Sequence, residues 1–206
     1  MFVMTIDQQG STRRGDQVAS LLAHLAERGL THPAKGFVLG FERTVGDEVQ
    51  AVLDSAERVV EVALELVRLD GWSIGIGAGE VHEPLPQTSR AASGQAFVHA
   101  RDAVERAKQR GSTVPLAVDG AHPERAGEAE ALLRLLGAVV ARRTPAGWAA
   151  VDALVAGAQT QKDVAARLGV SEQAVSQRLR TALWAEESAN RPLAARLLTE
   201  AQGAPA

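Results

Sequence analysis

The chain has 206 residues, of which 46% are hydrophobic and 23% are charged. These proportions are those of globular domains and exclude a disordered or low-complexity chain. Because no cysteine is present, disulfides, thiolate metal sites and a cysteine nucleophile are excluded. The formal net charge of −3 argues against a protein that coats nucleic acid non-specifically, so any DNA contact has to come from a local patch.

Targeting and membrane segments are not expected in this sequence. The apolar start from Met1 to Ile6 stops at Asp7, without the basic flank and the longer apolar run of a signal peptide. Later stretches are shorter than the roughly 18 apolar residues of a membrane span. We therefore predict no membrane association and place the protein in the cytoplasm.

The first part of the chain alternates between strand and helix patterns. Its apolar start predicts a strand, and the spacing of apolar residues over 18–25 predicts a helix that ends near Gly29. Apolar residues alternate over 36–53 on both sides of Gly46–Asp47, which is the pattern of a β-hairpin. These elements predict the beginning of an α/β fold.

Further elements follow in the same alternation. A helix capped by Asp54 or Ser55 is expected after the hairpin. Over 72–82 the sequence alternates Ile and Gly, which predicts a strand that another backbone or a ligand approaches closely. Two more elements are predicted beyond it: a helix over 93–110 that ends at Gly111, and a short strand over 114–118. The order β-α-β-β-α-β-α-β indicates helices packed on a largely antiparallel sheet.

From Glu124 onward the pattern is wholly helical. A Leu-rich helix runs to about Arg143, where Thr144–Pro145 breaks it. We predict a domain boundary there, which gives an α/β domain over 1–122, a connecting helix over 123–144 and an all-α domain over 145–206. The leucines of the connecting helix form either part of the core or a dimerisation surface, and the core is the commoner case.

Residues 160–183 fit the frame of a helix-turn-helix. With Gln161 as the first position, the positions of the frame that restrict the residue type most are occupied by Ala165, Gly169 and Val175. Ala165 is small where the second helix crosses, Gly169 can adopt the left-handed conformation of the turn, and Val175 seals the second helix against the first. The frame predicts a DNA-binding helix-turn-helix, and the alternative is a plain helical hairpin.

Capping residues accompany this frame. Thr160 and Asp163 have the spacing of a capping box at the start of the first helix. Ser171 is placed to cap the second helix. Leu183 is expected to face inward together with Val175, which leaves the opposite face of the second helix to solvent.

The outward face of the second helix suits double-stranded DNA. In the major groove Gln pairs with adenine and Arg with guanine, and the amides at a helix N-terminus favour phosphate. The predicted DNA-binding residues are Lys162, Arg167, Ser171, Glu172, Gln173, Ser176, Gln177, Arg178 and Arg180. Among them Lys162, Arg167 and Arg178 are the expected phosphate contacts. Because one unit offers few such contacts, we expect a homodimer on a repeated half-site.

Four motifs precede the helix-turn-helix in a fixed order. They are TIDQQGS at 5–11, VGDEVQ at 45–50, IGIGAGEVH at 74–82 and GQAFVHARDAVERAKQRG at 94–111. In this order, the chain resembles the SatD family over nearly its full length. More remotely it is similar to the nucleotide-cyclase palm fold of diguanylate cyclases, where an Asp ends the first strand and a Gly-Gly-Asp/Glu-Glu-Phe hairpin supplies further carboxylates. The resemblance implies a ferredoxin-like, palm-like sheet for the α/β domain.

The same resemblance implies a nucleotide or metal site. The matching residues are Asp7 as the first metal carboxylate, Asp47 as the second, Glu48 as the neighbouring acid and Lys108 as the phosphate-binding lysine. Carboxylates held together can bind Mg²⁺ against a nucleotide phosphate, with a lysine to offset the remaining charge. The same residues also have a purely structural interpretation, in which Asp7 ends a strand and Gly46–Asp47 makes a tight turn.

Three positions depart from the cyclase pattern. Val45 replaces the first glycine of the hairpin, Val49 replaces the aromatic residue, and Ser112 falls where the pattern has an arginine. The implied domain is therefore catalytically degenerate, and no catalytic residue is assigned.

The leading hypothesis is a dimeric transcriptional regulator. Its palm-like domain would sense a nucleotide or metal, and its helix-turn-helix would read DNA. One alternative is a Mg²⁺-dependent nucleotidyl-transfer enzyme that acts on purine nucleotides. Another is an interaction module whose helix-turn-helix contacts a second protein instead of DNA.

Overall fold

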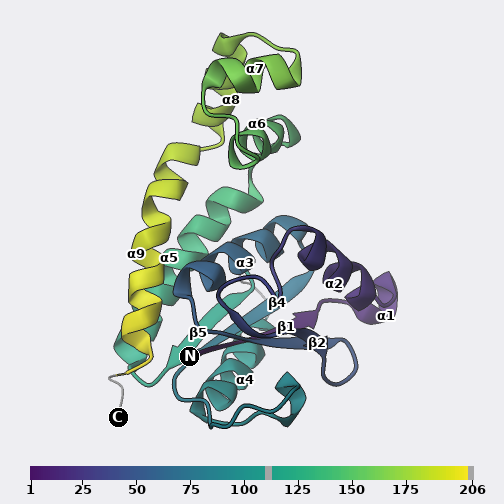
Figure 1. Cartoon of the computed structure of the whole chain (residues 1–206), viewed down its shortest axis with the longest axis vertical. Coiled ribbons are helices and arrows are strands. Elements are labelled where there is room, and N and C mark those ends of the chain that lie inside the picture. The colour runs from purple at the N-terminus through teal and green to yellow at the C-terminus, as the bar shows by residue number, and fades with distance from the viewer. Residues whose placement is uncertain (110–112, 204–206) are drawn as a thin grey trace.

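A mixed five-strand sheet with helices on both faces is followed by an all-helical C-terminal region (Figure 1). This arrangement comes from a computed structural model of the chain that describes residues 1–109 and 113–203. It confirms the predicted α/β class of the first part and the helical character of the second.

The sheet follows the predicted order of elements. Its strands are β1 (Phe2–Gln8), β2 (Phe37–Arg43), β3 (Glu48–Leu53), β4 (Trp72–Ala78) and β5 (Leu116–Gly120). Their spatial order is β2-β3-β1-β4-β5, with β4 and β5 parallel and the other pairs antiparallel. The predicted hairpin is confirmed: β2 and β3 pair directly, and Gly46 has a positive φ of 62° in the turn between them.

Helices cover both faces of the sheet. The helices of the first part are α1 (Ser11–Arg14), α2 (Val18–Glu27), α3 (Ala56–Leu69), the short 3₁₀ helix η1 (Ser89–Ala91) and α4 (Gln95–Ala107). Ser55 caps α3, because its hydroxyl accepts the backbone N–H of Arg58. Helix α4 ends at Ala107, whereas the end predicted at Gly111 lies outside the described residues.

The alternation of side chains on β1 divides the core into two layers. Phe2, Met4 and Ile6 join the main core beneath α2 and α3, whereas Val3 joins a smaller cluster against α4. The glycines of β4 explain how close α4 comes. A Cβ at Gly77 would collide with the backbone of α4, so the predicted close approach of another backbone to this strand is confirmed.

The C-terminal region contains five helices within residues 113–203, and Figure 1 shows how they rise from the sheet. They are α5 (Pro123–Ala141), α6 (Pro145–Val155), α7 (Gln161–Leu168), α8 (Glu172–Thr181) and α9 (Trp184–Ala201). We call residues 145–182 the head, and residues 1–109 and 113–144 the body. The head has its own small core, formed by side chains of α6, α7 and α8.

Helix α9 returns from the head to the body along α5 (Figure 1). Its residues Ala194, Ala195 and Leu198 belong to the main core beside the sheet. The segment predicted as one all-α domain thus contains the head and a helix that packs on the body. The division of the chain at residue 145 stays a prediction.

The Leu-rich stretch of α5 belongs mostly to the core. Leu133 and Leu136 are buried against the sheet side, whereas Leu135 is 63% exposed. Helices of the described residues are all too short or too polar to cross a bilayer.

Candidate nucleic-acid interface

Both helices of the predicted helix-turn-helix frame are present, and each begins at its predicted cap. At the start of α7 the Thr160 hydroxyl accepts the N–H of Asp163, and the Asp163 carboxylate accepts the N–H of Thr160 at 2.9 Å. Helix α7 ends at Gly169 in the left-handed conformation (φ 64°, ψ 36°). The Ser171 hydroxyl then accepts the N–H of Ala174 and caps α8. These local contacts confirm the predicted capping residues.

The packing of α8 against α7 depends on one small residue and two valines. Val164 and Val175 are completely buried, and Ala165 between them is nearly so. Helix α6 closes this core from the third side through Ala150 and Ala153. Residues 145–155 were expected to belong to the all-α domain, but a helix over them was not predicted. Its signal was present, because a capping threonine followed by proline, as at Thr144–Pro145, starts helices as well as ending them.

One packing expectation is wrong. Leu183 was expected to face inward beside Val175, but it is 44% exposed. The reason is that α8 ends at Thr181 and Leu183 adopts a left-handed backbone (φ 50°) at the start of α9. The helical periodicity that would have placed Leu183 over Val175 therefore stops before it is reached.

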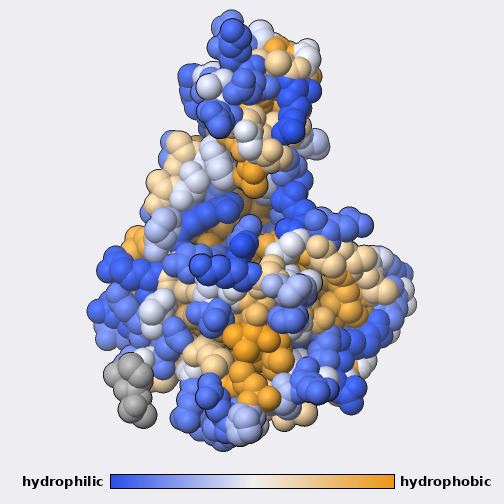
Figure 2. All heavy atoms as spheres, in the orientation of Figure 1, coloured by the Kyte–Doolittle hydropathy of each residue, from blue (hydrophilic) through white to orange (hydrophobic). Residues whose placement is uncertain are grey.

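The predicted DNA-binding residues fall on one polar part of the head. Seven of them are exposed, namely Lys162, Arg167, Ser171, Glu172, Gln173, Gln177 and Arg180, and two are half-buried, namely Ser176 and Arg178. Arg167 also donates to the carbonyl of Ala153 at 3.4 Å, so part of its hydrogen-bonding capacity is used inside the head. Figure 2 shows hydrophilic residues over much of the tip of the molecule, where the head lies.

The head is joined to the body by a buried arginine. The side chain of Arg143 is fully buried and donates from Nε and Nη2 to the carbonyl of Ala182, at 3.3 and 3.2 Å. It also meets the fully buried carboxylate of Glu187 at 3.4 Å. Its guanidinium lies 4.4 Å from the centre of the Trp148 ring and 5.8 Å from that of Trp184. Burial lowers the pKa of Arg143, and the charge of Glu187 opposes this shift.

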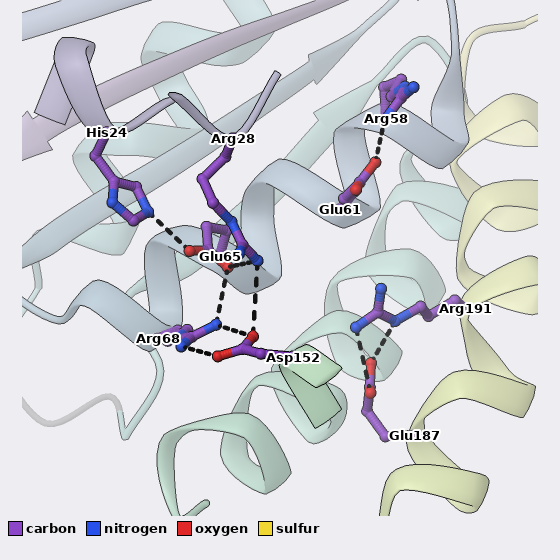
Figure 3. A network of polar contacts seen from close by, with 9 residues as sticks. All are labelled: His24, Arg28, Arg58, Glu61, Glu65, Arg68, Asp152, Glu187 and Arg191. Carbon is purple, nitrogen blue, oxygen red and sulfur yellow. Dashed lines mark hydrogen bonds and ion pairs between the residues drawn. The ribbon is translucent and has the colours of Figure 1, made fainter. Parts of the chain in front are cut away.

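A second connection runs from α3 to α6. Arg68 of α3 forms a bidentate pair with Asp152 of α6, with both N···O distances at 2.7 Å. Glu65, one turn earlier on α3, lies 3.5 Å from Arg28 and 3.8 Å from Arg68 (Figure 3). The hydrogen bond that Arg68 donates to Asp152 raises the pKa of Arg68, although burial acts against this shift. The head is thus held to the body by charged groups at two places, Arg143 and the Arg68–Asp152 pair.

The residues implied as a nucleotide or metal site lie near one another at the end of β1. Asp7 pairs in register with Glu48 of β3, and the ammonium of Lys108 lies 2.9 Å from Asp7. Lys108 also lies 2.8 Å from Glu105. Asp47 sits in the hairpin turn, and the Glu48 carboxylate accepts the Thr44 hydroxyl at 2.6 Å. The structure therefore brings together Asp7 and Lys108 as an ion pair.

The charges at this position are only partly balanced. Burial raises the pKa of Asp7; the hydrogen bond and charge of Lys108 oppose the shift, and the charges of Asp47 and Glu48 add to it. Burial acts to lower the pKa of Lys108, but its contacts with Glu105 and Asp7 outweigh burial and raise it.

This arrangement does not fit a Mg²⁺ site. Across residues 1–109 and 113–203, acidic and histidine side chains nowhere form a group of three or more that could hold a metal ion. The ammonium of Lys108 forms an ion pair with the Asp7 carboxylate, which Mg²⁺ would need as a ligand. Ser112, the third position that departs from the cyclase pattern, lies outside the described residues.

Comparison with protein-family models, with curated proteins and with solved structures finds no match for this chain.

The left-handed turn between α7 and α8 gives a stability prediction. Gly169→Ala should lower the free energy of unfolding by about 1 kcal/mol, because alanine disfavours this backbone region. Gly127→Ala in the second turn of α5 is the matched control and should raise it by about 0.5–1 kcal/mol. At both positions the added Cβ meets nothing within 4 Å, so clashes do not contribute. Urea unfolding measures both; a stabilising Gly169→Ala would contradict the left-handed turn.

The shifted pKa of Asp7 gives a prediction with a defined pH dependence. Because the pKa of Asp7 is raised in the folded state, its ionised form costs stability at neutral pH. Asp7→Asn should therefore raise the urea midpoint near pH 7, and the gain should shrink as the pH falls through the folded pKa toward the ordinary value of 3.8.

Asp16→Asn serves as the control with the opposite sign. The hydrogen bond from Arg43 lowers the pKa of Asp16, so its carboxylate stabilises the fold at neutral pH and this contribution is lost as the pH falls. Asp16→Asn should therefore lower the urea midpoint at pH 7 and have little effect in acid. An Asp7→Asn variant that loses stability at pH 7 would show that the ionised Asp7 is needed by the fold.

Proposed function

We propose that the chain is a cytoplasmic DNA-binding transcriptional regulator whose head reads double-stranded DNA through α8. The observation that supports this most directly is the division of α8 into two faces. Val175 is completely buried against α7, while Gln173, Gln177 and Arg180 are exposed. The side chains that suit base edges are therefore free to enter a major groove.

The charges of the head support the same proposal. The side chains of Arg178 and Arg180 make no hydrogen bond or ion pair with other described residues. They are available for phosphates or bases, together with Lys162. The capped N-terminus of α8 presents its amides from the same end as Ser171 and Gln173, where phosphate binding is favoured. A contact of this kind positions the helix, and the base-facing side chains specify the sequence.

The body supports the proposed kinship with the SatD family and its palm-like sheet. The strand order β2-β3-β1-β4, connected as β-α-β-β-α-β, is that of a ferredoxin-like unit. In our proposal the body dimerises, because one head supplies too few phosphate contacts for tight binding. The ion pair between Asp7 and Lys108 gives the enzymatic alternative no support, so we do not propose turnover of a nucleotide.

Replacement of Arg180 tests the assignment of the recognition face. Fragments bound by the purified protein are first selected from sheared genomic DNA, and the best one serves as operator. Arg180→Ala should weaken operator binding by about 1–3 kcal/mol, or roughly 5–150-fold, without changing the melting temperature. Operator affinity should also fall steeply with salt concentration.

The matched control is Arg101→Ala, since Arg101 is an exposed arginine on α4 of the body. This variant should bind the operator like the parent chain. Equal affinity of the Arg180→Ala variant and the parent would refute the assignment of α8. Failure to select any specific fragment would favour a head that contacts another protein.

A further inference from the structure

A pocket of about 400 Å³ opens between α2 and the turn from α3 to β4. One wall is apolar and consists of Leu21, Leu69 and Trp72. Polar side chains line the pocket as well, among them Gln17, directly before α2, and His24 of α2. The volume lies within the range of small-ligand sites, roughly 300–1,000 Å³. The pocket is separate from the DNA-binding face of the head and from the Asp7–Lys108 pair.

The lining of the pocket includes two opposite charges. Arg14 and Asp70 lie 3.8 Å apart, with side chains 57% and 82% exposed. An ion pair this exposed contributes about 0–1 kcal/mol, so a ligand could replace either partner at little cost. Asp70 also holds a backbone conformation (φ 56°, ψ 158°) that strongly favours glycine. The chain thus has an aspartate at a position where the backbone conformation favours glycine.

These charges suit a ligand that carries both signs on adjacent atoms. A guanidinium binds a carboxylate through paired hydrogen bonds, so Arg14 would take the carboxylate of a zwitterion. Asp70 would take its ammonium group. The apolar wall of Leu21, Leu69 and Trp72 would then receive a hydrophobic side chain. This combination of groups belongs to α-amino acids with apolar side chains.

His24 connects the pocket to the ion pairs that hold the head. Its Nε2 lies 2.8 Å from Glu65, while its Nδ1 makes no hydrogen bond with the described residues. Glu65 contacts Arg28 and Arg68, and both arginines reach Asp152 of α6, at 3.9 and 2.7 Å (Figure 3). A ligand that moves His24 away from Glu65 would let this carboxylate compete with Asp152 for the two arginines.

We propose that the pocket binds a free α-amino acid with an apolar side chain, and that His24 transmits its binding to the contact between body and head. Binding itself does not depend on the function proposed above. Its effect on DNA affinity does, because a ligand regulates DNA binding only if it distinguishes two arrangements of the head.

Calorimetry on the full chain tests the site. Leucine, isoleucine, valine, phenylalanine, methionine and tryptophan are titrated separately. At least one should bind below about 1 mM, and its analogues without the amino or the carboxylate group should bind at least about tenfold more weakly. If none of the six amino acids binds at concentrations up to about 10 mM, the proposed site is overturned. Equal binding of an analogue that lacks one charged group would overturn the assignment of an amino acid.

Two variants and one control locate the binding to this pocket. Arg14→Gln and Asp70→Asn should each weaken binding at least about tenfold, and asparagine has nearly the same size and shape as the aspartate that it replaces. Arg13→Gln is the matched control, because Arg13 lies on the same short helix but outside the lining of the pocket. Unchanged affinity in both pocket variants would refute the site.

The transmission through His24 can be read without DNA. The chain has three tryptophans, and Trp72 lines the pocket while Trp148 lies 3.9 Å from Arg68 at the head. With 5-fluorotryptophan incorporated, the amino acid should shift the ¹⁹F resonances of both Trp72 and Trp148. In the His24→Gln variant only Trp72 should shift. If the amino acid does not shift the Trp148 resonance in the parent chain, transmission to the head is refuted, whereas the proposal that the pocket binds an amino acid is unaffected.

Operator affinity measured with and without the amino acid separates the two proposals. A change in affinity that disappears in His24→Gln supports regulation of DNA binding. Absence of DNA binding under all conditions would overturn the function proposed for the head. Calorimetry would still decide whether the pocket binds an amino acid.

Discussion

The position of the head depends on the buried guanidinium of Arg143. It lies where α5 gives way to α6, and it binds the carbonyl of Ala182 at the end of α8 and the carboxylate of Glu187 in α9. Three helices are therefore fixed to one side chain. Removing one partner from a buried ion pair typically costs about 3–5 kcal/mol, because the other charge is left without compensation. The rings of Trp148 and Trp184 add favourable contact with the cation.

This arrangement has a consequence for the proposed binding of DNA. Helices α5 and α9 run side by side from the sheet to the head (Figure 1). Near the head, the ion pair of Arg143 and Glu187 connects them. The Arg68–Asp152 pair fixes α6 to the body as well. Helix α8 is thus held at a defined distance from the sheet. In a dimer formed through the body, such a connection would set the spacing between two recognition helices, which must match the spacing of the half-sites.

Much of the local structure could be predicted from sequence because it depends on neighbouring residues. The capping box of α7, the left-handed Gly169 and the hairpin at Gly46 each involve residues only a few positions apart. The glycines of β4 also had an interpretable pattern, since only a strand without Cβ atoms admits a helix backbone so closely. These features fix the limits of single helices and strands in the sheet and in the head.

The connection between head and body could not be predicted in the same way. Arg143 and Glu187 are 44 positions apart, and Arg68 and Asp152 are 84 apart. In the sequence each is one of many charged residues, and no spacing indicates its partner. The return of α9 to the main core was also missed, because its alanines are small and give little amphipathic pattern. The exposed Leu183 is part of the same omission, since it marks the point where α9 turns back.

The absence of cysteine allows the most direct test of the claim that α8 reads DNA. A single cysteine is introduced by Gln177→Cys on α8, or by Leu135→Cys on α5 of the body, and is labelled with a DNA-cleaving iron chelate. Bound to the selected operator, the chain labelled at residue 177 should cut both strands within the recognised half-site, and the chain labelled at residue 135 should not cut there. Cleavage from residue 135 with none from residue 177, in complexes of equal affinity, would show that DNA contacts a different face of the protein.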